Sequence, residues 1–361
     1  MSLFLQSISL LQFKNYSHQS FQFTERIVGI CGRNGAGKTN LLDAIHYLCF
    51  TKSYFARQDA VNVRHGNQGF RLEGYFLLND KEEKTVCILR ETGRKEFSVN
   101  DEPYIKFSKH IGRYPCVVIA PDDVELIIGV SEERRKFIDT ILSQLDNSYL
   151  LALINYTKIL QQRNSFLRSL SDGFAKDFSV LDVLDEQLVK EGTIVFEKRK
   201  VFLQTFLPIA EQKYGEISQQ GERINLVYDS ELHTVSMEEL LKLTRQKDMV
   251  VQRTSGGVHR DELLFNLGEQ TFKSIASQGQ RKSLLFALKL AEMEILKKEK
   301  GFSPLLLLDD VFEKLDEERI TNLLAQICDD KDMQIFITDT NCKRLEETLK
   351  TIGQGLQLQV L

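Results

Sequence analysis

Hydrophobic positions in the first 120 residues follow strand and helix periodicities in turn. Strict alternation and short apolar runs predict strands, and a longer run with helical spacing predicts a helix. The predicted strands are 3–13, 26–31, 69–78, 84–90 and 115–121, and the predicted helix is 39–50. Because the turn residues Asn79 and Asp80 follow the third strand, we expect a hairpin there.

The pattern becomes helical from Ser131 onward. Nine apolar residues between Ile138 and Leu170 are spaced alternately by four and three, and Arg163 fills the remaining position. Such a heptad seam predicts a long helix, and a second helical run follows at 178–214. Two helices of about 35 residues, at ~1.5 Å rise per residue, would form an antiparallel pair roughly 50 Å long. The pair could be a projecting arm or a subdomain folded on the core.

An α/β pattern returns after a mixed stretch at 216–250. Strands are predicted at 262–267, 304–310 and 333–338, and helices at 280–298 and 317–328. Strands that alternate with helices favour a mostly parallel sheet. The chain is therefore predicted to have an α/β core that a helical segment interrupts, in three parts: 1–125, 126–250 and 251–361.

Composition and charge are those of an ordinary globular protein. Hydrophobic residues make up 42% and charged residues 27% of the 361 positions, which is enough apolar surface for a large core. The net charge of −4 gives no global sign of nucleic-acid binding. Any contact with phosphate backbones would have to come from local basic patches.

No apolar run approaches the ~20 residues that span a bilayer, and we expect no membrane association. The apolar N-terminus is interpreted as a strand and not as a signal peptide. Six scattered cysteines without a C-x-x-C pair predict buried, reduced thiols in a cytoplasmic protein, not a zinc site or a disulfide framework.

The most specific motif reads GRNGAGKT and lies between a predicted strand and a predicted helix. It satisfies the P-loop pattern, in which glycines let backbone N–H groups face a phosphate at a helix N-terminus. Lys38 would contact the β and γ phosphates of ATP, and Thr39 would supply a hydroxyl to Mg²⁺. The predicted ATP-binding residues are Gly32, Arg33, Asn34, Gly35, Ala36, Gly37, Lys38, Thr39 and Asn40.

Two carboxylates follow the apolar run Leu305–Leu308. Such a run is typical of a strand buried on both faces, and ligands bind at the carboxyl ends of these strands. Asp309 would hold Mg²⁺, and Asp310 would orient the attacking water or take its proton. Alone, the pair would be interpreted as a solvated turn; together with the P-loop it indicates an NTPase, with Lys38 and Asp310 as catalytic residues.

A polar turn at 277–280, Ser-Gln-Gly-Gln, begins the predicted helix before the acidic strand. The turn resembles the signature motif of ABC-type ATPases. In that family Ser277, Gly279 and Gln280 would bind the γ-phosphate held in the P-loop of a second subunit. A hydroxyl, glycine N–H groups and the positive end of a helix together form an anion site. The alternative is a simple helix cap.

Segments near the acidic strand support this resemblance. Leu315-Asp316 resembles the D-loop, and Thr338-Asp339 occupies the switch position, where many relatives have His. Asp122 or Asp123 takes the place of the Q-loop glutamine. The resemblance assigns no role to these switch and Q-loop positions.

The chain as a whole resembles the RecF family of SMC-like ABC ATPases. Matching segments run nearly end to end: FKNY, GRNGAGKTNLLDAI, KSYFARQD, VVIAPDDVELIIGVSEERRKFID, SGGVHRDELLF, SQGQRKSLLFALKLAE, LLLLDDVFEKLD and QIFITDT. Two departures are Val258, where the family usually has Pro, and the two-Gln turn. The implied fold is an ABC-type head, a P-loop α/β core plus an antiparallel β subdomain, interrupted by a helical arm.

The resemblance also implies a function in DNA replication, DNA repair and the SOS response to DNA damage. It implies a weak, DNA-stimulated ATPase that forms a homodimer on ATP and binds duplex and gapped or single-stranded DNA. Its partners would be RecR and RecO, with which it would help to load a recombinase.

Other polar residues have two interpretations. His259, Arg260 and Asp261 would couple the signature helix to the nucleotide, or they form a charged turn. Lys14, Asn15 and Arg57 touch nucleotide in the family, or they are solvated. The basic clusters 133–137 and 196–202 would meet DNA phosphates, or they are exposed helix faces.

Three other classes of protein share parts of this pattern. A transporter subunit shares the motifs, but 239 residues separate Lys38 from Ser277, more than a compact subunit needs. An SMC-like tether would need a longer arm. A nuclease fused to such a head would need a second acidic cluster, for which the C-terminal residues leave no room.

Overall fold

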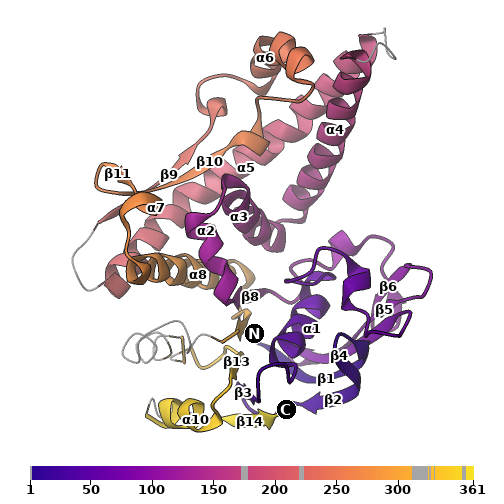
Figure 1. Cartoon of the computed structure of the whole chain (residues 1–361), viewed down its shortest axis with the longest axis vertical. Helices are drawn as coiled ribbons and strands as arrows, with labels where there is room; N and C mark the ends of the chain where they lie inside the picture. Colours follow the sequence, from indigo (N-terminus) through magenta and orange to yellow (C-terminus); the bar gives the residue numbers. More distant parts are fainter. Residues whose placement is uncertain are drawn as a thin grey trace. The chain divides into compact units, whose positions relative to one another are not determined.

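The computed structural model describes residues 2–171, 178–218, 223–310, 324, 327–328, 330–351 and 355–361. The chain divides into two compact units (Figure 1). Unit 1 comprises Met1–Asp123 and Glu292–Leu361, and unit 2 comprises Val124–Ala291, so the boundary falls within helix α8 (Gln278–Lys300). Residues 251–291 therefore belong to the same compact unit as the helical segment. The division into three parts at 125 and 250 stays a prediction.

A five-stranded parallel sheet forms the centre of unit 1. Its order is β14-β3-β13-β12-β8, with bounds Gln357–Val360, Ile27–Cys31, Ile335–Asp339, Leu305–Leu308 and Cys116–Ile119. Every residue of the four strands other than β14 is buried, which explains why their sequences are apolar except for Thr338 and Asp339 at the end of β13. Helix α10 (Cys342–Thr351) packs near β3, since a Cβ on Gly29 would meet Leu345.

A six-stranded sheet forms the second layer of unit 1, and its neighbouring strands are all antiparallel. Its order is β2-β1-β4-β5-β6-β7, with bounds Tyr16–Gln22, Leu3–Phe13, Phe70–Leu78, Lys81–Leu89, Lys95–Val99 and Glu102–Pro103. Asn79 (φ 52°) and Asp80 (φ 63°) both adopt the left-handed conformation that a two-residue hairpin turn requires. The predicted hairpin is confirmed: β4 ends at Leu78 and β5 begins at Lys81, three residues before the predicted start of the second strand.

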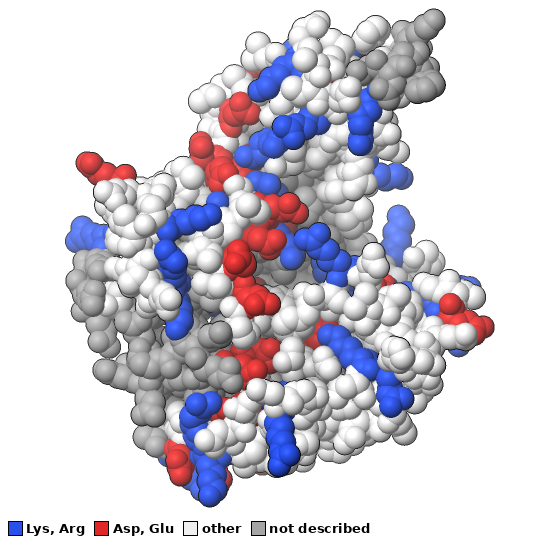
Figure 2. Space-filling model, in the orientation of Figure 1, with Lys and Arg blue, Asp and Glu red and all other residues white. Residues whose placement is uncertain are grey.

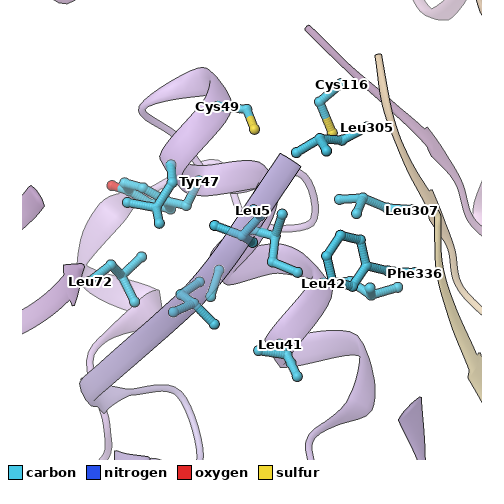
Figure 3. Close-up of a cluster of buried hydrophobic side chains, with 14 of the residues drawn as sticks. Leu5, Leu41, Leu42, Tyr47, Cys49, Leu72, Cys116, Leu305, Leu307 and Phe336 are labelled. Carbon is cyan, nitrogen blue, oxygen red and sulfur yellow. The ribbon is translucent and has the colours of Figure 1, made fainter. Parts of the chain in front are cut away.

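Helix α1 (Lys38–Phe50) joins the two sheets into one core (Figure 3). Leu42 and Tyr47 of α1 are fully buried with Leu5 of β1, Leu307 of β12 and Phe336 of β13. Each such side chain contributes about 1.5–3 kcal/mol by leaving water. The packing fixes the first turn of α1, and with it the P-loop, over the ends of the parallel strands.

Unit 2 is mainly helical and carries a small antiparallel sheet. Its helices are α2 (Glu125–Ile128), α3 (Ser131–Leu145), α4 (Asn147–Ser171), α5 (Ser179–Ser218), α6 (Met237–Val251), α7 (Phe272–Ile275) and the first part of α8. Its strands are β9 (Ile224–Asp229), β10 (Glu262–Leu267) and β11 (Gln270–Thr271), in the order β11-β10-β9. In Figure 1, α4 and α5 lie side by side over most of α4.

The prediction of one long first helix is wrong, because Asp146 divides it into α3 and α4. Its backbone is extended (φ −135°, ψ 106°), and its carboxylate accepts hydrogen bonds from the N–H groups of Ser148 (2.8 Å) and Tyr149 (3.2 Å). These bonds cap α4. The seam nevertheless faces inward. From Ile138 to Arg163, every seam residue except Leu145 is buried.

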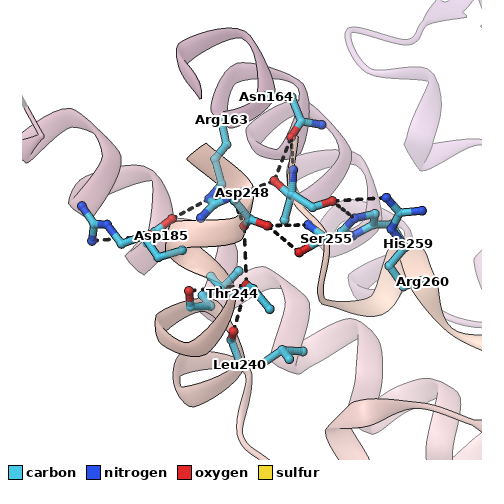
Figure 4. Close-up of polar contacts among 12 residues, drawn as sticks. Arg163, Asn164, Asp185, Leu240, Thr244, Asp248, Ser255, His259 and Arg260 are labelled. Atoms are coloured by element: carbon cyan, nitrogen blue, oxygen red, sulfur yellow. Dashed lines mark hydrogen bonds and ion pairs between the residues drawn. The ribbon is translucent and has the colours of Figure 1, made fainter. Parts of the chain in front are cut away.

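Arg163 occupies its seam position as the centre of a buried polar network (Figure 4). Its guanidinium donates to Asp185 at 2.6 Å, Asp248 at 2.8 Å and the Thr254 hydroxyl at 2.9 Å. Two carboxylates from α5 and α6 thus compensate one buried cation from α4. Removing one partner of such a network typically costs about 3–5 kcal/mol.

Candidate active site

The P-loop lies between β3 and α1, and two of its glycines have left-handed backbones. Gly35 has φ 82° and Gly37, which precedes the first residue of α1, has φ 114°. A Cβ on Gly37 would lie 2.5 Å from the Asn15 amide and 2.9 Å from the Tyr16 hydroxyl. Only glycine fits there without displacing both neighbours.

The β1–β2 turn holds this loop from one side. The Asn15 amide donates to the carbonyl of Ala36 at 3.0 Å and accepts from the Asn40 amide at 2.8 Å. The Tyr16 hydroxyl donates to the carbonyl of Gly37 at 3.0 Å. Asn15 is therefore a brace for the P-loop in this structure. The sequence did not indicate that Tyr16 belongs to the site.

Lys14 and Arg57, the other residues that the resemblance associates with nucleotide, differ in their surroundings. The Lys14 ammonium forms an ion pair with the buried Asp43 carboxylate at 2.5 Å. Arg57 is exposed. Nucleotide contact by either residue stays a prediction.

Lys38 is buried, with 4% of its surface exposed, and its ammonium group faces its own loop. It donates to the carbonyls of Gly32 at 3.1 Å and Arg33 at 3.4 Å. Within the described residues, no carboxylate lies within ion-pair distance of it. A buried cation satisfied only by carbonyls favours an incoming anion.

Asp309 lies directly across from the P-loop helix. Both of its carboxylate oxygens are 3.0 Å from the Thr39 hydroxyl, and one is 2.9 Å from the Thr338 hydroxyl. Burial raises the pKa of Asp309 above its usual range, although both hydroxyl bonds oppose this shift. No lysine or arginine of the described part of the chain forms an ion pair with it. A buried carboxylate beside a threonine hydroxyl is a fitting oxygen donor set for Mg²⁺, which also keeps waters and phosphate oxygens as ligands.

Asp310 follows in a left-handed conformation, with φ 43°. Its backbone N–H donates to the Thr338 hydroxyl at 2.8 Å, and its side chain is partly exposed at the carboxyl end of the sheet. The structure therefore brings together the residues that the sequence assigned to phosphate, Mg²⁺ and water: Lys38, Thr39, Asp309 and Asp310.

Two of the three acidic residues at the switch and Q-loop positions form ion pairs or hydrogen bonds within unit 1. Asp339 is buried and forms an ion pair with Arg344 at 2.6 Å. Asp123 accepts from the Tyr54 hydroxyl and from the N–H of Ala120. Asp122, by contrast, is exposed. The predicted D-loop residues 315–316 lie outside the described residues.

The signature turn in unit 2 forms a capping box at the start of α8. The Ser277 hydroxyl accepts from the N–H of Gln280 at 3.2 Å, and the Gln280 amide oxygen accepts from the N–H of Ser277 at 2.7 Å. The helix begins at Gln278, two residues earlier than predicted. Ser277 is exposed, and Gly279 is partly exposed in the first helical turn. A role of these residues toward a second subunit stays a prediction.

The segment at 259–261 packs against helices α4 and α5 of unit 2, with Asp261 buried, His259 half-buried and Arg260 exposed. His259 shares a hydrogen bond of 2.7 Å with the Tyr156 hydroxyl, and its other ring nitrogen lies 3.1 Å from the carbonyl of Thr254. Burial lowers the pKa of His259 to about 4, so the ring is neutral near pH 7. Asp261 accepts from Arg199 at 2.9 Å. These contacts join α4, α5 and the start of β10, and coupling of this segment to the nucleotide stays a prediction.

The basic clusters are less available to DNA than their sequences suggest. The alternative of an exposed helix face at 196–202 does not hold at Arg199, which is 3% exposed and bonded to Asp139 and Asp261. Arg135 donates to the carbonyl of Asp261 at 2.7 Å, and Arg134 forms an ion pair with Glu262 at 3.3 Å. Basic and acidic residues are interspersed on the face seen in Figure 2.

Comparisons with known proteins agree along nearly the whole chain. A family model described as RecF/RecN/SMC N terminal domain matches residues 4–358. The DNA replication and repair protein RecF of Flavobacterium johnsoniae is 41% identical, over 98% of this chain and 99% of the relative. The protein of the same name from Bacteroides thetaiotaomicron is 41% identical, over 99% of this chain and 96% of the relative. A solved structure described as the recombination mediator protein RecF-ATPrS in the RecFOR pathway aligns with a TM-score of 0.87 and 28% identity, over 94% of this chain and 93% of that one.

The fold and the site define an SMC-like head of the ABC-type ATPase class. No helix in the described ranges is long and apolar enough to cross a membrane. The chain belongs to the RecF/RecN/SMC N-terminal domain family and, within it, to the RecF proteins. The fold class and family predicted from the sequence are both confirmed.

Proposed function

We propose that this protein is an ATP-dependent DNA-binding protein of recombinational repair and replication, and that ATP hydrolysis acts as its switch. One observation carries the proposal: Lys38, Thr39 and the Asp309–Asp310 pair converge at the carboxyl ends of β3 and β12. The full-length similarity to proteins named for DNA replication and repair supports the biological role. A solved relative described as RecF-ATP supports ATP as the nucleotide.

Nucleotide binding would use the loop and its lysine. The N–H groups of the loop would surround the β-phosphate at the start of α1, where the helix dipole favours negative charge. The Lys38 ammonium would exchange the carbonyls of Gly32 and Arg33 for phosphate oxygens. Since those carbonyl bonds are 3.1 and 3.4 Å long, we expect this exchange to cost little.

Thr39 and Asp309 would hold Mg²⁺ between them and the phosphates. Bound there, Mg²⁺ would neutralise charge that develops on the transferred phosphoryl group. Asp310, partly exposed at the same edge, would orient the attacking water or accept its proton. The site would thus use one carboxylate to bind the cation and its neighbour to act on water.

We further propose that ATP drives homodimerisation, in which Ser277, Gly279 and Gln280 meet the nucleotide of the other subunit. The exposure of Ser277 at the start of α8 supports this assignment. The dimer would bind duplex and gapped DNA in the cytoplasm and act with RecR and RecO, in line with a relative described as part of the RecFOR pathway.

The test is the rate of ATP hydrolysis by the purified protein with and without gapped DNA. We expect slow hydrolysis that requires Mg²⁺ and rises several-fold with DNA. Hydrolysis that is unaffected by DNA, or that co-purifies with membranes, would contradict the proposal and favour a transporter subunit.

A further inference from the structure

Thr338 lies opposite the first acidic residue on the neighbouring strand. In the parallel pair of β12 and β13, Leu308 is in register with Ile337, so Thr338 and Asp309 are next in line. Alternation along the strands places Thr338 on the same sheet face as Phe336, and Asp309 on the face of Leu307, which is the side of the α1 core. Thr338 is fully buried.

The Thr338 hydroxyl is shared between the two acidic residues. It accepts from the backbone N–H of Asp310 at 2.8 Å and lies 2.9 Å from one carboxylate oxygen of Asp309. A carboxylate oxygen of Asp310 is farther away, at 3.4 Å. Because a hydroxyl has a single proton and an N–H can only donate, the hydroxyl donates to Asp309 while it accepts from Asp310.

The backbone of Asp310 depends on this bond. Its φ of 43° lies in the left-handed region, which costs a residue other than glycine about 1–2 kcal/mol. In this conformation its N–H points back to β13, to the Thr338 hydroxyl. The Thr338 side chain therefore constrains the end of β12 in two ways. It fixes the rotamer of Asp309 and the backbone conformation of Asp310.

We propose that Thr338 is a positioning residue that holds Asp309 for the divalent cation and Asp310 for the attacking water. This inference rests on the proposed ATPase function and deepens it. Thr338, at the switch position, would then act on the nucleotide only through the carboxylates of Asp309 and Asp310. If Thr338 only filled space in the sheet, removing its hydroxyl would not change the positions of these two carboxylates.

The test compares three variants of the full-length protein. Thr338→Val keeps the shape and the preference for a strand but removes the hydroxyl, and Thr338→Ser keeps the hydroxyl. Thr340→Val is the matched control, because Thr340 is exposed at the end of the same segment. Changes in residues that orient metal ligands typically lower metal affinity or activity by about 10–100-fold.

For Thr338→Val we expect kcat to fall by about 10–100-fold while KM for ATP stays within about twofold. The Mg²⁺ concentration at half-maximal binding of ATP should rise by about tenfold. Thr338→Ser should recover most of both losses, and Thr340→Val should match wild type. The unfolding temperature without nucleotide should show that each variant is folded.

Unchanged kcat and Mg²⁺ dependence in Thr338→Val, or equal losses in Thr338→Ser, would overturn the inference. If Thr338→Val does not fold, Thr338→Cys gives the same comparison, since a thiol packs well but bonds weakly. The Mg²⁺ dependence of ATP binding needs no hydrolysis. A wild-type protein that binds ATP with Mg²⁺ but does not hydrolyse it would therefore refute the proposed ATPase, while Thr338 would still be judged by binding.

Discussion

The Thr39 hydroxyl lies 3.0 Å from both carboxylate oxygens of Asp309, although the two residues are 270 positions apart in the chain. Thr39 is in the first turn of α1, and Asp309 follows β12 directly. The contact shows that the site is assembled from both ends of the sequence. It also explains why unit 1 has two segments, Met1–Asp123 and Glu292–Leu361.

Lys38→Ala should abolish ATP binding and hydrolysis without unfolding the protein. The lysine is buried, but its ammonium bonds only to loop carbonyls, so its removal breaks no ion pair in the described residues. Equilibrium binding of a fluorescent ATP analogue and the unfolding temperature would measure both effects. Lys106→Ala, at an exposed lysine outside the loop, should behave as wild type. Near-normal hydrolysis by Lys38→Ala would refute the P-loop assignment.

Asp310→Asn should retain Mg²⁺ and ATP binding, because Thr39 and Asp309 are unchanged. Hydrolysis should fall by about 10²-fold or more, since a positioned base typically contributes 10²–10⁴-fold. The ATP-bound dimer on DNA should then live longer, which surface-based dissociation measurements would show. Asp332→Asn is the control, at an exposed acid on the same unit. A dimer lifetime equal to that of wild type would mean that Asp310 does not activate water.

Ser277→Asp separates the two interpretations of the signature turn. Aspartate is a good N-cap, so the helix should keep its stability, whereas its charge should repel a γ-phosphate. We expect normal ATP binding by single subunits but no ATP-dependent dimer. Ser236→Asp is the matched control, because Ser236 forms an equivalent capping box with Glu239 on α6. If Ser277→Asp dimerises like wild type, the turn is only a helix cap.

Mixing Lys38→Ala with Ser277→Asp tests whether the turn acts on the other subunit. In a head-to-tail dimer one composite site carries both defects, and the other combines an intact P-loop with an intact turn. Each variant alone should be inactive, and the mixture should recover part of the dimerisation and hydrolysis. If the mixture is as inactive as each variant alone, one intact composite site is not sufficient for dimerisation and hydrolysis.

His259 should make the protein less stable in acid. Burial lowers its pKa to about 4 in the folded state, against about 6.5 when unfolded. The unfolded chain therefore binds more protons below pH 6.5, and stability is lost as the pH falls from about 6.5 to 4. The expected loss between pH 7 and pH 5 is about 2 kcal/mol from this residue.

Urea unfolding at both pH values would measure the effect. His259→Gln should remove about 2 kcal/mol of the difference in the free energy of unfolding between pH 7 and pH 5. An unaltered pH dependence in His259→Gln would show that the folded-state pKa of His259 is not lowered.

Local sequence patterns predict the elements that position the site. They do not predict which side chains are buried or bonded through contacts between distant parts of the chain. The P-loop, the hairpin at Asn79-Asp80 and the acidic strand each have a short-range cause, and all were predicted. The break at Asp146 also has a local cap signal, but the apolar seam continues through it and concealed the break. The burial of Arg199 and the bonds of Thr338 depend on partners distant in sequence, Asp261 and Asp309, which no local pattern indicates.

ATP-dependent dimerisation is tested most directly by the mass of the wild-type protein in solution, measured by light scattering with Mg²⁺ and gapped DNA. We expect a second copy per complex when ATP is present, a single copy with ADP or without nucleotide, and no second copy for Lys38→Ala. An oligomeric state that is the same with ATP, with ADP and in the Lys38→Ala variant would contradict it.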